Sequence, residues 1–274
     1  MQSLSSLPLF HIAFYRFTPI SEPEVLAADL RRLTEKLSGS VLVAHEGING
    51  VLAGTASALD AFEQSLCDPH YLKGAFVGLA FRRSACETPP FAKIKIHCKN
   101  EIVALGAGCT VGSGKRGIDV SPKEWRELIA QDDVVVIDNR NSFEHRLGRF
   151  KGSIDPQVST FRDFSHYIEV HAPIWQAAGK RIAMYCTGGI RCEKTSACMS
   201  DFGIDIYQLE GGILNYFQTI PDAQLEWEGE CFVFDNRMAL DTSLKETQTN
   251  AEQVYNHPED AWRLARALRL EQGP

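Results

Sequence analysis

The second half of this chain alternates short apolar runs with helical patterns, and that alternation restricts the fold more than any other feature. Residues 134–138 are apolar up to a final aspartate, as buried parallel strands often are. Residues 181–185 and 205–209 are further strand-like runs. Three ranges have apolar residues at helical spacing: 161–170, 190–202 and 213–220. Strands that alternate with helices indicate an α/β domain with a parallel sheet.

A helix signal marks the start of this domain. Ser121-Pro122-Lys123-Glu124 combines an N-cap serine, a proline at the first helical position and a glutamate at the third. This capping box predicts a helix from about Pro122. The domain is therefore expected to cover residues 118–225, followed by a C-terminal extension over residues 226–274.

The first third of the chain predicts a smaller α+β domain. Asn49-Gly50 stands between two apolar runs, which is a strong signal for a β-hairpin turn. The order β-α-β-β-α-β is that of a ferredoxin-like, or acylphosphatase-like, domain, which we place at residues 8–106. The strand-like runs lie at 10–17, 41–44, 51–54, 76–81 and 94–105, and the helical patterns at 22–37 and 56–67.

A glycine-rich stretch separates these two patterns. It runs from Gly106 to Gly117 and has neither the strand-then-helix context nor the Gly-Lys-Ser/Thr of a phosphate-binding loop. We interpret residues 107–117 as a flexible linker.

Composition and charge place the chain among ordinary globular proteins, with 44% hydrophobic and 23% charged residues. No apolar run approaches the roughly 20 residues that span a bilayer, and the N-terminus lacks the basic region of a signal peptide. We therefore expect a cytoplasmic protein with no membrane partner. The net charge of −7 disfavours nucleic-acid binding by bulk charge, but a local basic patch would suffice for phosphate contacts.

The segment Cys186-Thr187-Gly188-Gly189-Ile190-Arg191 joins a predicted strand to a predicted helix. Its two glycines let the backbone turn tightly and point N–H groups inward, and such a nest at a helix N-terminus favours an anion. The same field lowers the pKa of a cysteine and makes it nucleophilic. Arg191 is always charged and can bind an anion bidentately. We predict Cys186 and Arg191 as catalytic; the alternative is a buried structural cysteine in a tight turn.

This segment resembles the active-site loop of the rhodanese family, a Cys-x4-Arg loop between strand and helix. The resemblance extends upstream to Asp138, Arg140 and Glu144 and covers roughly residues 118–225, which implies a rhodanese α/β domain. Asp138, Arg140 and Glu144 are then supporting residues, either for catalysis or as an ion-pair network. The related dual-specificity phosphatases have Cys-x5-Arg, so the shorter loop of this chain favours sulfur over phosphate.

Further segments carry a closer resemblance. They are Glu46–Gly50, Cys186–Lys194, Gly212–Tyr216, Trp227–Gly229 and Cys231–Asp235. Together they are similar to the rhodanese-domain tRNA uridine hydroxylases over nearly the whole chain, to about residue 240. The resemblance implies oxygen-dependent formation of 5-hydroxyuridine at the wobble position of tRNA, with Cys186 as the active-site residue and persulfide carrier. Many members have a later Cys-x-x-Cys segment, whereas this chain has no cysteine after Cys231, so no metal role is carried over.

Cys192 directly follows the loop, in the first turn of the predicted helix. A thiol at this place could resolve a persulfide or sulfenate on Cys186 as a disulfide, which makes Cys192 a candidate redox partner. Packing of Cys192 against the sheet is the alternative.

Basic residues gather near the end of the first domain. Around the last strand, Lys93, Lys95, His97 and Lys99 alternate with apolar residues, so a strand would place them on one face. A basic sheet face suits an RNA phosphate track, although a solvated strand face gives the same pattern. The RNA-binding candidates are Arg82, Arg83, Lys93, Lys95 and Lys99, to which Lys115-Arg116 in the linker would add.

Two functions are consistent with these features. The first is a tRNA-modifying enzyme that hydroxylates wobble uridine with molecular oxygen as co-substrate, as the family resemblance implies. The second is a sulfurtransferase or persulfide carrier, which the loop alone supports. A third, weaker hypothesis is a non-catalytic RNA-binding module. No flavin, haem or iron site and no two-His-one-carboxylate set is legible from spacing, so neither cofactor nor metal is expected.

Overall fold

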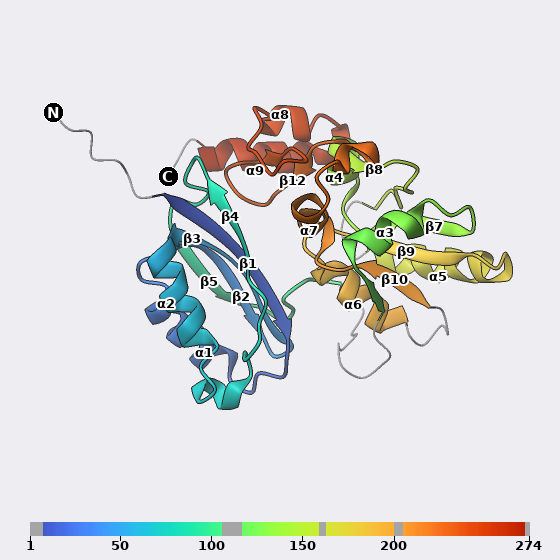
Figure 1. Cartoon of the computed structure of the whole chain (residues 1–274). Coiled ribbons are helices and arrows are strands. Elements are labelled where there is room, and N and C mark those ends of the chain that lie inside the picture. Colours follow the sequence, from blue (N-terminus) through green and yellow to red (C-terminus); the bar gives the residue numbers. More distant parts are fainter. Residues whose placement is uncertain (1–7, 106–116, 159–162, 200–204, 272–274) are drawn as a thin grey trace. The chain divides into compact units, whose positions relative to one another are not determined.

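The computed structural model describes residues 8–105, 117–158, 163–199 and 205–271. The chain divides into two compact units, residues 1–104 and 105–274 (Figure 1). The predicted linker over 107–117 lies outside the described residues except for Gly117, and so do Lys115 and Arg116. Within the described ranges, no helix is long and apolar enough to cross a membrane.

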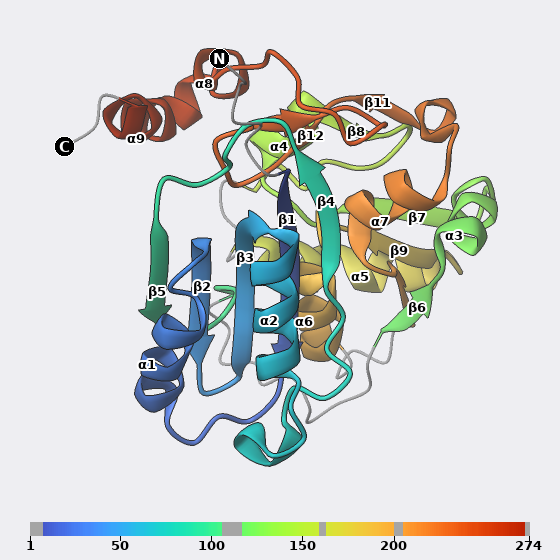
Figure 2. The same cartoon turned by 60° about the vertical axis from the view of Figure 1, so that its left-hand side comes forward.

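The first unit is one five-stranded sheet with two helices on the same face (Figures 1 and 2). The strand order is β4-β1-β3-β2-β5; β2 and β5 are parallel, and the other pairs are antiparallel. The elements are β1 (Leu9–Phe17), α1 (Pro23–Leu33), β2 (Ser38–Ala44), β3 (Gly47–Thr55), α2 (Ala56–Leu66), the 3-10 helix η1 (Tyr71–Gly74), β4 (Arg82–Cys86) and β5 (Ile94–Cys98). The predicted β-α-β-β-α-β order is confirmed.

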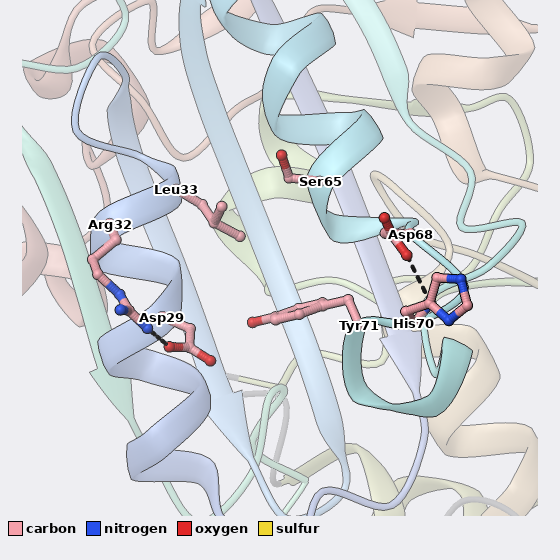
Figure 3. A pocket seen from close by; sticks show the side chains of 7 residues that line it. All are labelled: Asp29, Arg32, Leu33, Ser65, Asp68, His70 and Tyr71. Carbon is pink, nitrogen blue, oxygen red and sulfur yellow. Dashed lines mark hydrogen bonds and ion pairs between the residues drawn. The ribbon is translucent and has the colours of Figure 1, made fainter.

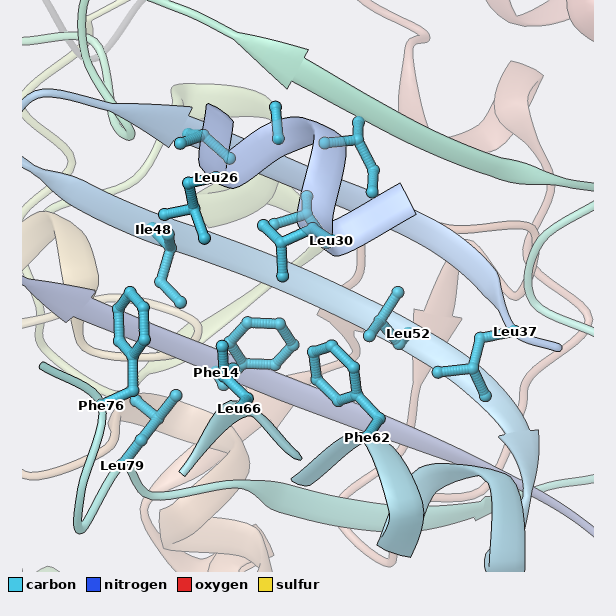
Figure 4. Packing of buried hydrophobic residues seen from close by; sticks show 14 of the residues in the cluster. Phe14, Leu26, Leu30, Leu37, Ile48, Leu52, Phe62, Leu66, Phe76 and Leu79 are labelled. Carbon is cyan, nitrogen blue, oxygen red and sulfur yellow. The ribbon is translucent and has the colours of Figure 1, made fainter. Parts of the chain in front are cut away.

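Apolar side chains from the sheet and both helices meet in a single core (Figure 4). Phe14 on β1 and Leu52 on β3 project towards Leu30 on α1 and Phe62 on α2, and all four are at most 3% exposed. The period of the strands places every second residue in this layer, and the helical period does the same for one stripe of each helix.

Two expectations for this unit are wrong, and the strand expected over 94–105 ends at Cys98. The β2–β3 turn lies at residues 45 and 46, and Asn49-Gly50 lies inside β3. Gly50 has a packing reason instead, since a Cβ there would stand 2.3 Å from the ring of Phe14. Residues 76–81 form no strand; Phe76 and Leu79 fill the core from an irregular segment, and the strand begins at Arg82.

The second unit is built on a parallel sheet of order β6-β10-β9-β7. Its elements up to residue 219 are β6 (Ile118–Val120), α3 (Pro122–Ile129), β7 (Val134–Asp138), α4 (Ser142–Leu147), β8 (Gly148–Phe150), α5 (Phe164–Ala177), β9 (Arg181–Tyr185), α6 (Ile190–Met199), β10 (Ile206–Leu209) and α7 (Gly212–Thr219). The capping box at Ser121 and Glu124 forms as predicted. The predicted class, an α+β unit followed by an α/β unit with a parallel sheet, is confirmed.

Helices cover both faces of this sheet, because its strands are apolar on both sides. Along β9, Ala183 and Tyr185 pack into one cluster with side chains of α3 and α7. Ile182 and Met184 pack into another cluster with side chains of α5 and α6. Cys186 continues the second set, so its side chain lies on the α6 side of the sheet.

The end of the chain packs back onto this unit. Strand β11 (Trp227–Gly229) pairs with β8, and β12 (Cys231–Phe232) pairs with β13 (Ala239–Leu240). Phe143 of α4, Phe232 and Val254 form a small buried cluster. The remaining elements are the 3-10 helices η4 (Ala223–Leu225) and η5 (Pro258–Asp260) and the helices α8 (Ala251–Val254) and α9 (Ala261–Glu271).

Candidate active site

The 186–191 loop lies where β9 ends and α6 begins. The carbonyls of Cys186 and Thr187 accept hydrogen bonds from the N–H groups of Ile213 and Leu214 on α7, at 3.0 and 3.2 Å. With its carbonyls turned to α7, the loop directs the Gly189 N–H to the Cys186 Sγ, at 3.1 Å. Gly189 has φ +99°, a backbone conformation that glycine adopts without strain.

The thiol of Cys186 is held as an anion beneath this loop. The residue is 0% exposed. Burial alone would raise the pKa of Cys186, but hydrogen bonds from the Cys192 side chain and backbone, the charge of Arg191 and the Gly189 N–H lower it to about 5. At neutral pH the site therefore presents a buried thiolate, which is the nucleophilic form of cysteine.

Arg191 is fixed by a carboxylate. Its Nη1 and Nη2 donate to the two Glu144 oxygens at 2.7 and 2.9 Å, and Nη2 also donates to Thr187 Oγ1 at 3.1 Å. Arg191 is 8% exposed and Glu144 is 0% exposed. Burial raises the pKa of Glu144, but the nearby charge of Arg191 and its hydrogen bonds lower that pKa below its usual value. The bidentate partner of Arg191 is thus a protein carboxylate, and its charge acts on Cys186 from a fixed position.

A second buried ion network is centred on Asp138, at the end of β7. Arg140 donates to both Asp138 oxygens, at 2.7 and 2.5 Å, and to the carbonyl of Gly148 at 2.6 Å. The Tyr185 hydroxyl donates to Asp138 at 2.8 Å, and the His145 ring lies 3.0 Å from the same oxygen. Asp138 and Arg140 therefore join the ends of β7 and β9 to β8 through buried hydrogen bonds and an ion pair.

Cys192 lies in the first turn of α6, with 1% of its surface exposed. Its thiol hydrogen-bonds to Cys186. Burial raises the pKa of Cys192, and the hydrogen bond to the Cys186 thiolate raises it further. The pair therefore holds one thiolate and one thiol. Asn139 Nδ2 contacts the Cys192 sulfur at 3.8 Å and Thr195 Oγ1 at 2.9 Å.

Several residues of this site were not singled out from the sequence. His145, Tyr185 and Asn139 are joined to it by contacts between segments far apart in the chain. Phe234 was noted only as part of a motif, although its ring lies over Arg191, with 6.0 Å between the ring centroid and Cζ. The sequence signal that was available is the second aromatic residue of the Phe232-Val233-Phe234 run, which alone does not show that its ring is exposed.

The RNA-binding candidates do not form one cluster. Arg82 and Arg83 lie on β4 and the lysines on or beside β5, at opposite edges of the sheet. Arg83 forms ion pairs with Asp60 and Glu63 of α2, both at 2.7 Å. Lys93, Lys95 and Lys99 are exposed. Because Ile96 faces the core under the helices, Lys95 lies on the opposite, helix-free face of the sheet.

A hollow of about 430 Å³ lies in the first unit, between α1 and η1 (Figure 3). Its lining residues are Asp29, Arg32, Leu33, Ser65, Asp68, His70 and Tyr71. None of these residues is a cysteine or belongs to the 186–191 loop, so this hollow is separate from the reactive cysteine. Among the residues that the structure describes, no group of three His, Cys, Asp or Glu side chains could hold a metal ion.

Two family models match this chain. A UPF0176 acylphosphatase-like domain matches residues 10–102, and a rhodanese-like domain matches residues 121–219. They agree with the fold classes of the two units.

Curated relatives match over most of their length. A protein named tRNA uridine(34) hydroxylase from Nitrobacter winogradskyi is 41% identical over 251 residues, which cover 90% of this chain and 98% of the relative. The protein of that name from Synechococcus is 43% identical over 246 residues, with 85% and 74% covered. Among solved structures, a rhodanese-related protein from Thermoplasma volcanium matches 38% of this chain and 93% of its own, at 23% identity and a TM-score of 0.29.

Proposed function

The chain belongs to the tRNA uridine(34) hydroxylase family, and from this premise we propose that it converts uridine 34 of tRNA to 5-hydroxyuridine, with Cys186 as the reacting residue and molecular oxygen as co-substrate. Family membership confirms the resemblance that the loop and its neighbouring motifs indicated. The observation that carries the proposal for Cys186 is its thiolate, held at 3.1 Å by the Gly189 N–H beside the fixed charge of Arg191.

The electron balance of the reaction gives Cys192 a role. Inserting one atom of O2 into the C5–H bond of uracil and releasing the other as water requires two electrons and two protons. The Cys186 thiolate and the Cys192 thiol can supply both electrons and one proton by forming a disulfide, and water supplies the second proton. Uridine, O2, one thiolate, one thiol and one proton then balance 5-hydroxyuridine, water and one disulfide. Both side chains lie in the same buried cluster, and the Cys192 thiol lowers the pKa of Cys186, so the two cysteines are near enough to interact. A cellular dithiol would then reduce the disulfide for the next turnover.

The first unit is proposed to hold the tRNA backbone. Lys95 is exposed on the helix-free face of the sheet, and Lys93 and Lys99 are exposed at the two ends of the same strand. Lysines spaced along a strand can follow a phosphate backbone. Arg83 is a weaker candidate, because two carboxylates already neutralise its charge.

A single-turnover experiment tests this proposal. Pre-reduced full-length protein is mixed with uridine-34 tRNA under O2 without added reductant, and nucleosides and cysteine peptides are measured by mass spectrometry. We expect up to one 5-hydroxyuridine per chain, together with a Cys186–Cys192 disulfide. Cys186→Ala should give no product, and Cys192→Ala should give none unless an external dithiol is added. Cys67→Ser, in the first unit, is the matched control and should behave like the wild type.

Two outcomes would contradict the proposal. Wild-type protein that leaves the nucleoside spectrum of tRNA unchanged would remove the hydroxylase function. If Cys192→Ala forms product at the wild-type yield without an added dithiol, the hydroxylase function stands. The Cys186–Cys192 pair is then not the source of the electrons.

A sulfurtransferase activity is the second candidate, because a low-pKa cysteine in this loop suits a persulfide. Sulfur transfer from thiosulfate to cyanide measures it directly. Rapid turnover together with unchanged tRNA would favour this function over hydroxylation.

A further inference from the structure

Phe234 exposes an aromatic ring beside the reactive loop. It lies in the turn between β12 and β13, and its side chain is 63% exposed. Its two predecessors, Phe232 and Val233, are buried. An apolar ring of this size in water forgoes the stabilisation that burial would give. Single exposed apolar residues are common on protein surfaces, so what sets Phe234 apart is its place beside the reactive loop.

The turn that carries Phe234 is firmly held. The Val233 N–H donates to the Met238 carbonyl at 2.9 Å, and the Met238 N–H donates to the Asp235 carbonyl at 3.1 Å. Arg237 and Asp235 form a buried ion pair at 2.6 Å within the turn. Phe232 is fixed in a buried cluster and packs edge to face against Phe234, with 4.9 Å between the two ring centroids. The exposed ring thus has a defined place and little freedom to fold inward.

That place is next to the chemistry. The Arg191 Cζ lies 6.0 Å from the centroid of the Phe234 ring, within the range of a cation–π contact. Arg191 also donates a hydrogen bond to Thr187, and its positive charge lowers the pKa of Cys186. The loop has room at its surface, because a Cβ built on Gly188 would meet no atom within 4 Å.

We propose that Phe234 is the platform on which the uracil of nucleotide 34 stacks while carbon 5 faces the Cys186 loop. The inference rests on the proposed function and names a substrate-binding residue for it. Enzymes that act on a base in RNA take it out of its stack and bind its face against aromatic or guanidinium planes. The rigid, exposed ring of Phe234 offers such an aromatic plane beside the loop, and the anticodon loop presents a base that is unpaired.

Substitution of Phe234 tests the platform through activity. Phe234→Ala should lower kcat/KM for uridine-34 tRNA roughly 5- to 150-fold, the range expected for one lost base stack. Phe234→Tyr and Phe234→Trp should restore most of it, whereas Phe234→Leu, which is apolar but not aromatic, should not. Leu225→Ala is the matched control, since Leu225 is an apolar residue of the same unit that is 59% exposed. The pH of half-maximal Cys186 alkylation should be equal in all variants, because Glu144 holds the Arg191 charge in place without the ring.

A binding measurement separates this inference from the hydroxylase function. Phe234→Trp in a Cys186→Ala background is titrated with an anticodon stem-loop RNA that carries uridine 34 and with the same RNA abasic at position 34. Quenching of the added tryptophan by the first RNA, with clearly less by the second, supports the platform even if no hydroxylation is found. Equal quenching by both RNAs overturns it. Wild-type kcat/KM in Phe234→Ala and Phe234→Leu also overturns it, while leaving the hydroxylase function intact.

Discussion

The two units bury different kinds of side chain. In the described part of the first unit, the buried polar side chains are His11 and Thr34, and the rest of the core is apolar. The second unit buries a set of ionisable and polar side chains beside its parallel sheet, which includes Asp138, Arg140, Glu144, His145, Arg191, Lys194, Gln208 and Arg237. The first unit is thus held by hydrophobic packing, whereas the second also depends on charges taken out of water.

This difference indicates where the chemistry lies. Removing two charges from water costs several kcal/mol per ion, and an ion pair with good geometry does little more than offset that cost. The buried pair of Glu144 and Arg191 is therefore weak evidence for added stability. What the pair does provide is a positive charge at a fixed position beside Cys186. The comparison therefore predicts that the ionic core is sensitive to loss of charge and the apolar core to loss of volume.

Breaking the buried pair should have the largest effect. Glu144→Gln leaves the Arg191 charge buried without a carboxylate, so we expect the free energy of unfolding of the second unit to fall by about 3–5 kcal/mol. Because Glu144 has a lowered pKa in the folded protein, its carboxylate stabilises the fold at neutral pH, and this contribution is lost as the pH falls through that pKa. The gap between variant and wild type in urea unfolding should therefore narrow at acid pH.

A surface pair of the same unit is the control for this prediction. Asp133 and Arg181 are 53% and 34% exposed and lie 2.8 Å apart, so Asp133→Asn should lower the free energy of unfolding far less than Glu144→Gln does. Equal losses from Glu144→Gln and Asp133→Asn would contradict the distinction between the two kinds of core.

Loss of volume in the first unit should have the next largest effect. Leu52 is 0% exposed in the middle of β3, so Leu52→Ala should lower the free energy of unfolding of this unit by about 2–5 kcal/mol. The pH dependence of Cys186 alkylation should stay unchanged, because no charge near the thiol has moved. A shifted alkylation profile in this variant would show that the two units are coupled, against the separation drawn from their cores.

Much of the architecture was predictable because it depends on local patterns. The period of apolar residues indicated the βαββαβ order and the parallel sheet, and the capping box located the start of α3. The reactive loop was also predictable, since a cysteine followed by two glycines at the end of a strand is a local feature. We placed the hairpin turn at Asn49-Gly50, but Gly50 lies inside β3, where the ring of Phe14 leaves no room for a Cβ. This contact joins two different strands, so no local pattern reveals it.

The surroundings of the loop depended on distant contacts in the same way. Glu144 lies 47 residues before Arg191, and this spacing does not predict that the two side chains form an ion pair. Phe234 reaches Arg191 from a turn more than 40 residues further along the chain. Chemistry-bearing residue types were therefore visible in the sequence, whereas their pairing needed the fold.

The smallest change is expected from the hydrogen bond between the two sulfurs. Cys186 is reactive as a thiolate, so its alkylation should rise as the pH passes its pKa of about 5 and level off above it. Cys192→Ala removes one donor to the thiolate while the charge of Arg191 and the Gly189 N–H remain. The pKa of Cys186 must then rise, and half-maximal alkylation should move up by roughly one to two pH units.

The measurement uses iodoacetamide, a small neutral reagent suited to a buried sulfur, with mass spectrometry of the peptide that contains Cys186. Cys192→Ser keeps a hydroxyl donor at the same place and should lie closer to the wild type than to Cys192→Ala. Cys67→Ser should not move the profile. If Cys192→Ala alkylates with the wild-type midpoint, then Arg191 and the loop N–H groups hold the thiolate without Cys192, and the ionic core of the second unit accounts for the reactivity of Cys186 by itself.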